Sequence, residues 1–359
     1  MSDSGMAFAG GAALAAAMGI GRFAFTPLLP LMQADAGVTV AEGGWLAAAN
    51  YAGYFCGALW AMARPAPPGP AVRKALLATG LTTLAMGATS SFTAWLALRL
   101  AAGIASAWAL IHVASWVGTL GRPLLGGVVF AGVGAGIAAA GLVCLALMSA
   151  GASAAQGWIV LGALCFMAAG LWRIESHTTK VSRNKRGIAW TPDALRLVLC
   201  YGAFGLGYII PATFVPAMAR EAIADPWMFG WAWPLFGLAA AASTLAAAPF
   251  SRRFGHRRVW AAAALVMALG VASPLLFPGF AGIAVAALLV GATFMVITMS
   301  GLREAPHLVA PLTAAFAAGQ IAGPLLVAAS AAFAVPLIAA SLLLTASAAA
   351  LVFNPRRTP

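Results

Sequence analysis

The sequence predicts an all-α polytopic membrane protein with twelve transmembrane helices, arranged as two six-helix parallel repeats. The first observation is composition, since 63% of the 359 residues are hydrophobic and 8% are charged, whereas a soluble domain is about half apolar and a quarter charged. The second is the length of the uncharged stretches, and the third is an internal repeat. The four Cys residues lie inside apolar runs, which indicates core packing instead of disulfides or metal ligands.

The uncharged stretches set the number of helices, because about 20 apolar residues cross a bilayer. The stretch between Arg122 and Arg173 is long enough for two crossings and has a polar break at 151–157. The stretches 259–302 and 308–354 divide in the same way, and the stretch after Asp225 gives one crossing. The predicted spans, in chain order, are 6–32, 43–63, 75–91, 94–119, 124–149, 152–172, 194–218, 228–249, 258–277, 279–301, 310–330 and 333–353.

The basic residues predict the orientation of these spans. An even number of spans places both termini on one side, and 16 of the 20 Lys and Arg residues fall on that side. Because cytoplasmic segments carry an excess of Lys and Arg, we expect a multi-pass protein of the cytoplasmic (inner) membrane with both termini cytoplasmic. This asymmetry accounts for the net charge of +12, and the scattered basic residues offer no surface for nucleic acid.

An internal repeat divides the chain in two. An offset of 186 residues places Arg22 on Tyr208 and aligns glycine, proline and aromatic positions in spans one, two and five with those in spans seven, eight and eleven. We therefore predict an N-terminal six-helix half at 1–172, a basic cytoplasmic linker at 173–193 and a C-terminal six-helix half at 194–359. Two parallel copies are typical of secondary transporters, which hold substrate between the halves near the middle of the bilayer.

Local motifs then indicate a family. Residues 248–258 resemble the basic loop GxLxDRxGRR with Ser251 at the acidic position, and residues 63–74 keep its glycine and trailing basic pair. Residues 98–103 resemble the RxxxG motif of a fourth helix, and 132–141 resemble a Gly-rich fifth helix. With these motifs the chain resembles the major facilitator superfamily. The first span of each half, at residues 19–30 and 203–216, resembles the YbfB/YjiJ-type branch of that superfamily.

The resemblance implies a permease that works by alternating access as a monomer, with a transported small molecule and the lipid bilayer as its partners. It also implies a gating role for four residues of the two basic loops. These are Gly69, Arg253, Gly255 and Arg257.

Two arginines within the predicted spans are candidate substrate ligands, because a charge at the membrane centre costs about 2.5–3.5 kcal/mol and marks function. Arg22 lies near the middle of span one, where neighbouring glycines and Pro27 and Pro30 predict a bend. Its alternative role is structural, bonded to carbonyls at the broken helix. Arg99 either faces the cavity or extends toward the outer end of span four. A guanidinium matches a carboxylate, so the pair favours a small organic anion.

Other polar side chains within the spans are candidates for the same site. Asn50, Tyr54, Tyr208 and Gln320 are predicted to bind substrate, although polar side chains also bond helices to one another. All eight acids lie in loops, termini or span ends. His112 is therefore the candidate proton relay, and its alternative is a His hydrogen-bonded within the bundle. Asp35 and Glu42, at the outer ends of spans one and two, are further candidates if the cavity opens to them.

The sequence thus favours a secondary active transporter for a small solute, a small organic anion first, with a proton as candidate coupling ion. An exporter of neutral or amphipathic small molecules, including sugars, is the alternative, and a transporter-like sensor is a further one. Catalytic residues, metal ligands and cofactors are not predicted, because no nucleophile has a base beside it and no His cluster has ligand spacing. An ATP-binding motif is also missing from the sequence.

Overall fold

The computed structural model describes residues 2–64, 66–120, 123–174, 190–223, 225–330 and 332–353. Most of the predicted linker, residues 175–189, lies outside the described residues, as do Arg122, Arg356 and Arg357. Every regular element in the described part of the chain is a helix. In chain order they are α1 (Asp3–Leu14), η1 (Ala15–Ile20), α2 (Phe25–Ala36), α3 (Val40–Ala63), α4 (Pro68–Met86), α5 (Phe92–Thr119), α6 (Pro123–Ser149), α7 (Ala154–Leu171), α8 (Pro192–Ala222), α9 (Pro226–Gly230), α10 (Ala232–Phe254), α11 (His256–Leu276), α12 (Phe280–Glu304), η2 (Pro306–Leu308), α13 (Val309–Ser330) and α14 (Ala334–Val352).

These helices form twelve membrane-crossing segments within the described residues, as the sequence predicts. Nine of the segments are long and apolar enough to cross a membrane on their own length and composition, the first running through α1, η1 and α2 as Asp3–Ala36. The other three are α3, α4 and α10. Helix α3 contains Glu42 and Asn50, α4 contains Arg73 and Lys74, and the apolar part of α10 is short. Packing against apolar neighbours places these three helices in the bundle.

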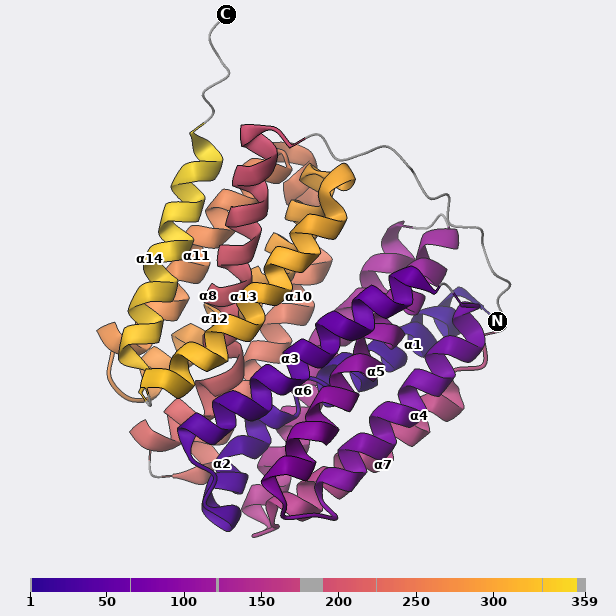
Figure 1. Ribbon diagram of the computed structural model, residues 1–359, viewed down its shortest axis with the longest axis vertical. Coiled ribbons are helices and arrows are strands. Elements are labelled where there is room, and N and C mark those ends of the chain that lie inside the picture. Colours follow the sequence, from indigo (N-terminus) through magenta and orange to yellow (C-terminus); the bar gives the residue numbers. More distant parts are fainter. Residues whose placement is uncertain are drawn as a thin grey trace, which may run out of the picture.

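The segments are grouped into two bundles. In the first, α5 packs against α3 and α4, α4 packs against α7, and α1 packs against α6. In the second, α8 packs against α13 and α14, and α11 packs against α12 and α14. The bundles meet where α6 packs on α10, α3 on α13 and α2 on α8. Figure 1 shows the two bundles together around α2 and diverging toward the beginning of α1 and the end of α14.

Burial shows on which side the bundles are closed. We call the side where α1 begins and α14 ends the terminal side, and the opposite one the far side. Every residue of 16–30 and of 207–219 is buried, so the far parts of the first segment and of α8 are enclosed by protein on all faces. The terminal parts of α1 and α8 have exposed faces. The described bundles are therefore joined in the middle and on the far side, and separate toward the terminal side.

Glycines bring α6 and α10 into backbone contact between the bundles. A Cβ atom at Gly134 would lie 2.3 Å from the amide nitrogen of Ala241, and a Cβ at Gly237 would lie 2.2 Å from that of Ala138. No side chain fits at such distances, because the neighbouring atoms are backbone. Small residues at close crossings are how helices pack in membranes, so this contact fixes the middle of the interface.

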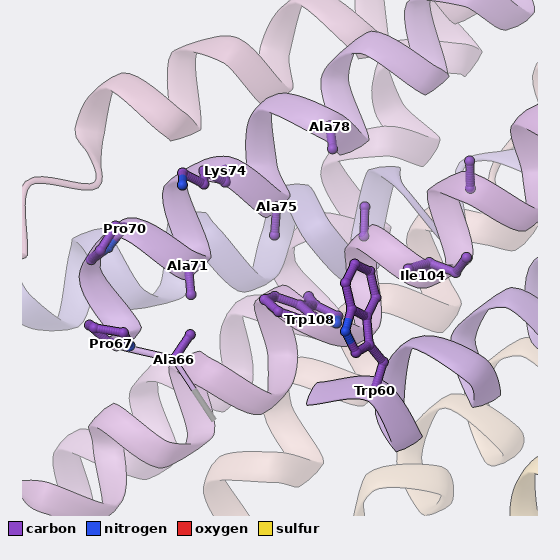
Figure 2. A pocket seen from close by; sticks show the side chains of 12 residues that line it. Trp60, Ala66, Pro67, Pro70, Ala71, Lys74, Ala75, Ala78, Ile104 and Trp108 are labelled. Carbon is purple, nitrogen blue, oxygen red and sulfur yellow. The ribbon is translucent and has the colours of Figure 1, made fainter. Parts of the chain in front are cut away.

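A separate pocket lies away from this interface. It has a volume of about 450 Å³ and is enclosed by the end of α3, the beginning of α4 and α5, on the terminal side of the first bundle. Figure 2 shows Trp60 and Trp108 on one wall and Lys74 on the other.

The α6–α10 contact predicts how two glycines of one helix differ. Gly134→Leu should lower stability by about 1–3 kcal/mol, the range for overpacking a filled interior. Gly127→Leu on the same helix should leave stability unchanged, because a Cβ there meets no atom within 4 Å. Melting of the detergent-purified variants measures both. Equal melting temperatures for the two variants would contradict the described packing.

Candidate functional site

The first membrane segment is broken in its middle, as its glycines and prolines predict. After α1 the chain continues as the π-helix η1, in which amides bond the carbonyl five residues back, as from Gly21 to Ala16 at 3.0 Å. Residues 21–24 form a turn before α2 begins. The amide of Thr26 bonds the carbonyl of Phe23 at 3.1 Å. The carbonyl of Arg22, which that amide would occupy in a regular α-helix, is therefore left for another donor.

Two polar side chains of neighbouring helices satisfy the carbonyls of this break. Asn50 on α3 donates its side-chain amide to the carbonyl of Gly21 at 3.3 Å and to that of Arg99 at 2.9 Å. Arg99 on α5 donates to the carbonyl of Arg22 at 3.2 Å and to that of Leu46 at 3.5 Å. Buried carbonyls need such partners. Asn50 and Arg99 therefore hold the break open and fix the direction in which it presents its side chains.

Arg22 is the side chain that the break presents. It is 3% exposed, and its guanidinium carbon lies 4.1 Å from the ring centre of Tyr54 and 5.0 Å from that of Tyr51. Its terminal nitrogen lies 3.5 Å from the Tyr208 hydroxyl, at the edge of hydrogen-bond distance. Its Nε has no hydrogen-bond partner. Aromatic faces stabilise a cation by about 0.5–2 kcal/mol, which offsets only part of the cost of burying it.

No carboxylate in the described part of the chain neutralises Arg22. Asp35 bonds the amide of Ala154 at 2.6 Å on the far side, where Glu42 caps α3. Asp193 and Glu304 form ion pairs on the terminal side. The remaining acids also lie toward the helix ends or outside the described residues. Arg22 is thus a buried cation whose nearest groups are aromatic rings and hydroxyls.

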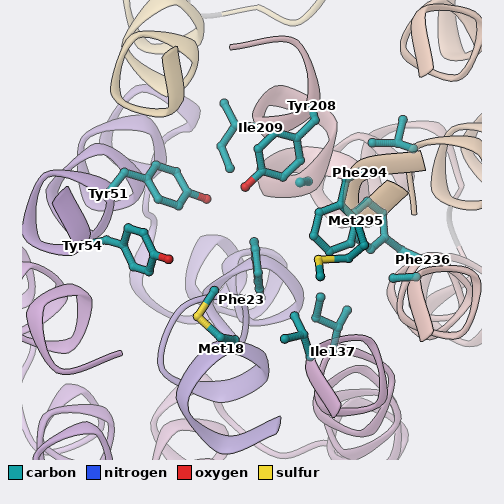
Figure 3. Close-up of a cluster of buried hydrophobic side chains, with 14 of the residues drawn as sticks. Met18, Phe23, Tyr51, Tyr54, Ile137, Tyr208, Ile209, Phe236, Phe294 and Met295 are labelled. Carbon is teal, nitrogen blue, oxygen red and sulfur yellow. The ribbon is translucent and has the colours of Figure 1, made fainter. Parts of the chain in front are cut away.

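The second bundle contributes an aromatic wall with a polar edge. Tyr208 stacks between Phe294 and Phe316, with ring centres 5.7 and 5.6 Å apart and planes 6° from parallel. Gln320 donates its side-chain amide to the Tyr208 hydroxyl, and its carbonyl oxygen has no partner. Figure 3 shows the hydroxyls of Tyr51, Tyr54 and Tyr208 directed toward one another across the two bundles.

Repeat-equivalent residues touch one another here. Arg22 contacts Tyr208, and the hydroxyl of Thr26 donates to the carbonyl of Ala212 at 3.0 Å, each pair 186 residues apart. Equivalent positions of two copies meet only next to the axis that relates the copies. The cluster therefore lies on the pseudo-symmetry axis between the bundles, where transporters of this architecture hold their substrate.

The structure thus brings together four of the residues predicted from sequence: Arg22, Tyr54, Tyr208 and Gln320. It places Asn50 and Arg99 behind them, where both bond backbone carbonyls. Sequence reasoning did not single out Thr213, which is 2.9 Å from the Tyr51 hydroxyl, nor the rings that flank Tyr208. Those rings carry no charge or motif that distinguishes them from core residues.

His112 lies in a different cluster. It is 3% exposed, its Nδ1 is 2.8 Å from the carbonyl of Trp108 on the same helix, and the two rings are 5.0 Å apart. None of the hydrogen bonds described for His112 leads to Arg22. Its assignment as a proton relay stays a prediction.

The four predicted loop residues take different positions on the terminal side. The Gly69 carbonyl accepts a hydrogen bond from the Trp172 indole at 2.9 Å, and Gly255 precedes α11 with a φ of 81°. Arg253 is exposed and lies over the Phe254 ring. The gating role of these four residues stays a prediction.

Arg257 joins three helices of the second bundle. It forms ion pairs with Asp193 at the start of α8, at 2.7 Å, and with Glu304 at the end of α12, at 2.9 Å. Arg196 pairs with the same Asp193. The acidic partners of this loop therefore come from other helices, whereas the loop's own acidic position is Ser251. Among the described residues no group of three or more His, Cys, Asp or Glu is arranged to hold a metal ion.

Comparison with known proteins agrees with this architecture. The family profile described as "Uncharacterised MFS-type transporter YbfB" matches residues 14–354. Among solved structures, a point mutant of the nucleoside transporter NupG is similar over 97% of this chain and 100% of its own, with a TM-score of 0.70 and 15% sequence identity. That identity establishes a shared fold only. No curated protein matches the sequence.

Only one of the two buried arginines should be needed for stability. Arg99→Met removes the donors of two buried carbonyls and should lower stability by about 1–3 kcal/mol. Arg22→Met removes a buried cation that has no counter-ion, and should leave the melting temperature unchanged or raise it. Thermal melting of the two detergent-purified variants measures the difference. A larger loss in Arg22→Met would assign Arg22 the structural role.

The terminal-side ion pairs predict a contrast between two arginines on either side of Gly255. Arg257→Gln should lower stability by about 1 kcal/mol, the upper range for a partly exposed pair. The loss should shrink in about 1 M salt, which screens the pairs in the wild type. Arg253→Gln, which has no ion pair among the described residues, should change neither the melting temperature nor its salt dependence. An equal loss in both variants would exclude the network as its cause.

Proposed function

We propose that this chain, which belongs to the YbfB family of MFS-type transporters, moves a small organic anion across the cytoplasmic membrane by alternating access. Membership of that family makes it a multi-pass membrane protein and a transporter, not an enzyme. The observation that carries the choice of substrate is the Arg22 guanidinium, buried between the bundles without a carboxylate partner.

The charge of Arg22 favours a monoanion. A buried charge without a partner is costly, and an opposite charge beside it removes most of that penalty. A carboxylate fits the guanidinium fork with two hydrogen bonds, and Nε is already without a partner. One cation in the cluster calls for one negative charge on the substrate, because a second would be left buried and unpaired.

The surroundings of Arg22 favour a substrate with an apolar body. Four apolar side chains lie beside the tyrosine hydroxyls in Figure 3. They are Phe23, Phe236, Phe294 and Met295. The unpartnered carbonyl oxygen of Gln320 offers one acceptor beside them. A small acid with an apolar or aromatic body and one further hydrogen-bond donor matches these groups.

The arrangement of the bundles supports alternating access. They are joined on the far side and separate on the terminal side, which the Lys and Arg distribution assigns to the cytoplasm. This is an inward-facing state, and rocking the bundles about the Gly134–Gly237 contact would open the other side.

Both bundles belong to one chain, so we propose that a monomer is sufficient. A coupling proton at His112 is a further proposal, since histidine is the side chain that ordinarily titrates nearest to neutral pH.

A neutral amphipathic substrate is the second candidate. Three aromatic rings already lie against the Arg22 guanidinium, and this contact stabilises the cation without an anion. NupG, which shares the fold, is described as a nucleoside transporter. In this alternative Arg22 and Gln320 would bond the hydroxyls or carbonyls of an uncharged compound.

A thermal-shift screen separates the two candidates. Detergent-purified protein is melted with small monocarboxylates, phosphate esters, sugars, amino acids and lipophilic cations. A ligand at about one hundred times its Kd adds about 2.7 kcal/mol of stability. We expect monocarboxylates to raise the melting temperature of the wild type and of Arg303→Gln, which removes an exposed charge away from the cluster, and to have no effect on Arg22→Gln.

Flux into proteoliposomes then tests transport of the compound that binds. Uptake of that labelled compound by the wild type and by Arg303→Gln, with at least a tenfold loss in Arg22→Gln, is the expected result. Shifts only with neutral compounds, persisting in Arg22→Gln, would replace the anion with the second candidate. Binding without uptake would contradict transport itself.

A further inference from the structure

The pocket of the first bundle lies on the periphery of the protein. Its walls come from α3, α4 and α5 (Figure 2). The main packing partners of helix α4 are α5, α7 and η1, all in the first bundle, so α4 lies on the side of that bundle away from the second. A pocket that opens beside α4 therefore faces the lipid and not the Arg22 cluster.

A second pocket occupies the repeat-equivalent place. It lies between α10, α11 and α12 and has a volume of about 600 Å³. Helix α4 lines the first pocket with residues 70, 71, 74, 75 and 78, and α11 lines the second with residues 258, 259, 262, 263 and 266. The two sets match at an offset of 188 residues, two more than the offset of 186 that relates spans one, two and five to spans seven, eight and eleven, and in this match Lys74 and Arg258 lie one helical turn apart. Two copies of one pocket at matching positions are a property of the repeat and not an accident of one loop.

Both pockets combine apolar walls with one cation. Lys74 lines the first and Arg258 the second; both are exposed, and no acidic side chain lines either pocket. Neither cation forms an ion pair in the part of the chain that the structure describes. The indole nitrogen of Trp108, on the wall of the first pocket, is buried without a hydrogen-bond partner. Each pocket thus offers an apolar trough with an unneutralised positive charge, and the first adds a free donor.

The position in the membrane identifies the ligand class. Both pockets lie on the terminal side, close to the starts of α4 and α11. The basic groups at this level that line the pockets are Lys74 and Arg258, near the first turns of these two helices. An acyl chain suits an apolar trough that opens to the bilayer, and volumes of 450 and 600 Å³ lie in the range of ligand sites, about 300–1,000 Å³. Basic groups at this depth attract anionic headgroups.

We infer that each bundle binds one anionic phospholipid of the terminal-side leaflet, with an acyl chain in the pocket and the phosphate against Lys74 or Arg258. The two sites are independent of the substrate that the Arg22 cluster takes. In each half of the transporter, one lipid would lie between three helices: α3, α4 and α5 in the first half and the corresponding α10, α11 and α12 in the second.

Native mass spectrometry of the delipidated full chain tests this inference. The protein is titrated with phosphatidylglycerol or with phosphatidylcholine, and bound lipids are counted. We expect two phosphatidylglycerol molecules to bind about fivefold more tightly than phosphatidylcholine, the effect of about 1 kcal/mol for one basic residue at a membrane surface. Lys74→Gln and Arg258→Gln should each remove the preference at one site, and the double variant should remove both.

Two kinds of variant make the test specific. Ala78→Trp and Val266→Trp fill the exposed ends of the two pockets, and each should reduce the number of bound lipids of either type by one. Arg73→Gln, an exposed neighbour that lines neither pocket, should bind as the wild type does. Equal affinity for the two lipids, or an equal loss in Arg73→Gln and Lys74→Gln, would overturn the inference. Unchanged lipid numbers in the Trp variants would overturn it as well.

Discussion

The structure depends on one buried charge, the Arg22 guanidinium, placed in the middle of the membrane without a counter-ion. In a regular helix the carbonyls of Gly21 and Arg22 would accept hydrogen bonds from amides of the same helix. Asn50 and Arg99 would then have no carbonyls to bond beside Arg22. The π-helix and the turn at 21–24 release these carbonyls, and Asn50 and Arg99 bond them. The cation is then held against the Tyr51 and Tyr54 rings of the first bundle and beside the Tyr208 hydroxyl of the second, instead of against an acid.

The pseudo-symmetry of the chain determines where this charge lies. Repeat-equivalent residues meet at Arg22–Tyr208 and Thr26–Ala212, so the charge sits at the axis about which the two bundles are related. The close glycine contact of α6 with α10 is near the same level, and the bundles separate only beyond it, toward the terminal side. A ligand bound at Arg22 would touch both bundles at once, and this links occupancy of the cluster to the angle between them.

Much of the fold could be predicted from sequence, because the bilayer sets the apolar length of each span and the internal repeat relates spans in the two halves. The orientation inferred from the Lys and Arg asymmetry stays a prediction. The site was predictable only in part. A charged or polar residue in a span is visible, and Arg22, Tyr208 and Gln320 were found in this way. Hydropathy cannot tell which way such a residue faces, and so the support given by Asn50 and Arg99 to the broken helix was not distinguished from ligand binding. The half boundaries at 172 and 194 stay predictions.

The partners of Arg22 and Arg257 were beyond sequence reasoning for a different reason. Phe294 and Phe316 are indistinguishable from core aromatics until Tyr208 is seen between them. Asp193 and Glu304 reach Arg257 from helices far apart in the chain, and no local spacing encodes such a pair. The two proposed lipid pockets could not be predicted for the same reason, because each is formed by residues of three separate helices.

As an unneutralised cation, Arg22 should accept an anion between the two bundles. Crystals grown in bromide test it directly, because bromide is an anion located by its anomalous scattering. We expect a bromide within about 4 Å of the Arg22 guanidinium, a distance at which opposite charges attract strongly in a low-dielectric site, and no bromide there in Arg22→Gln. Bromide at exposed arginines with none at Arg22 would contradict it.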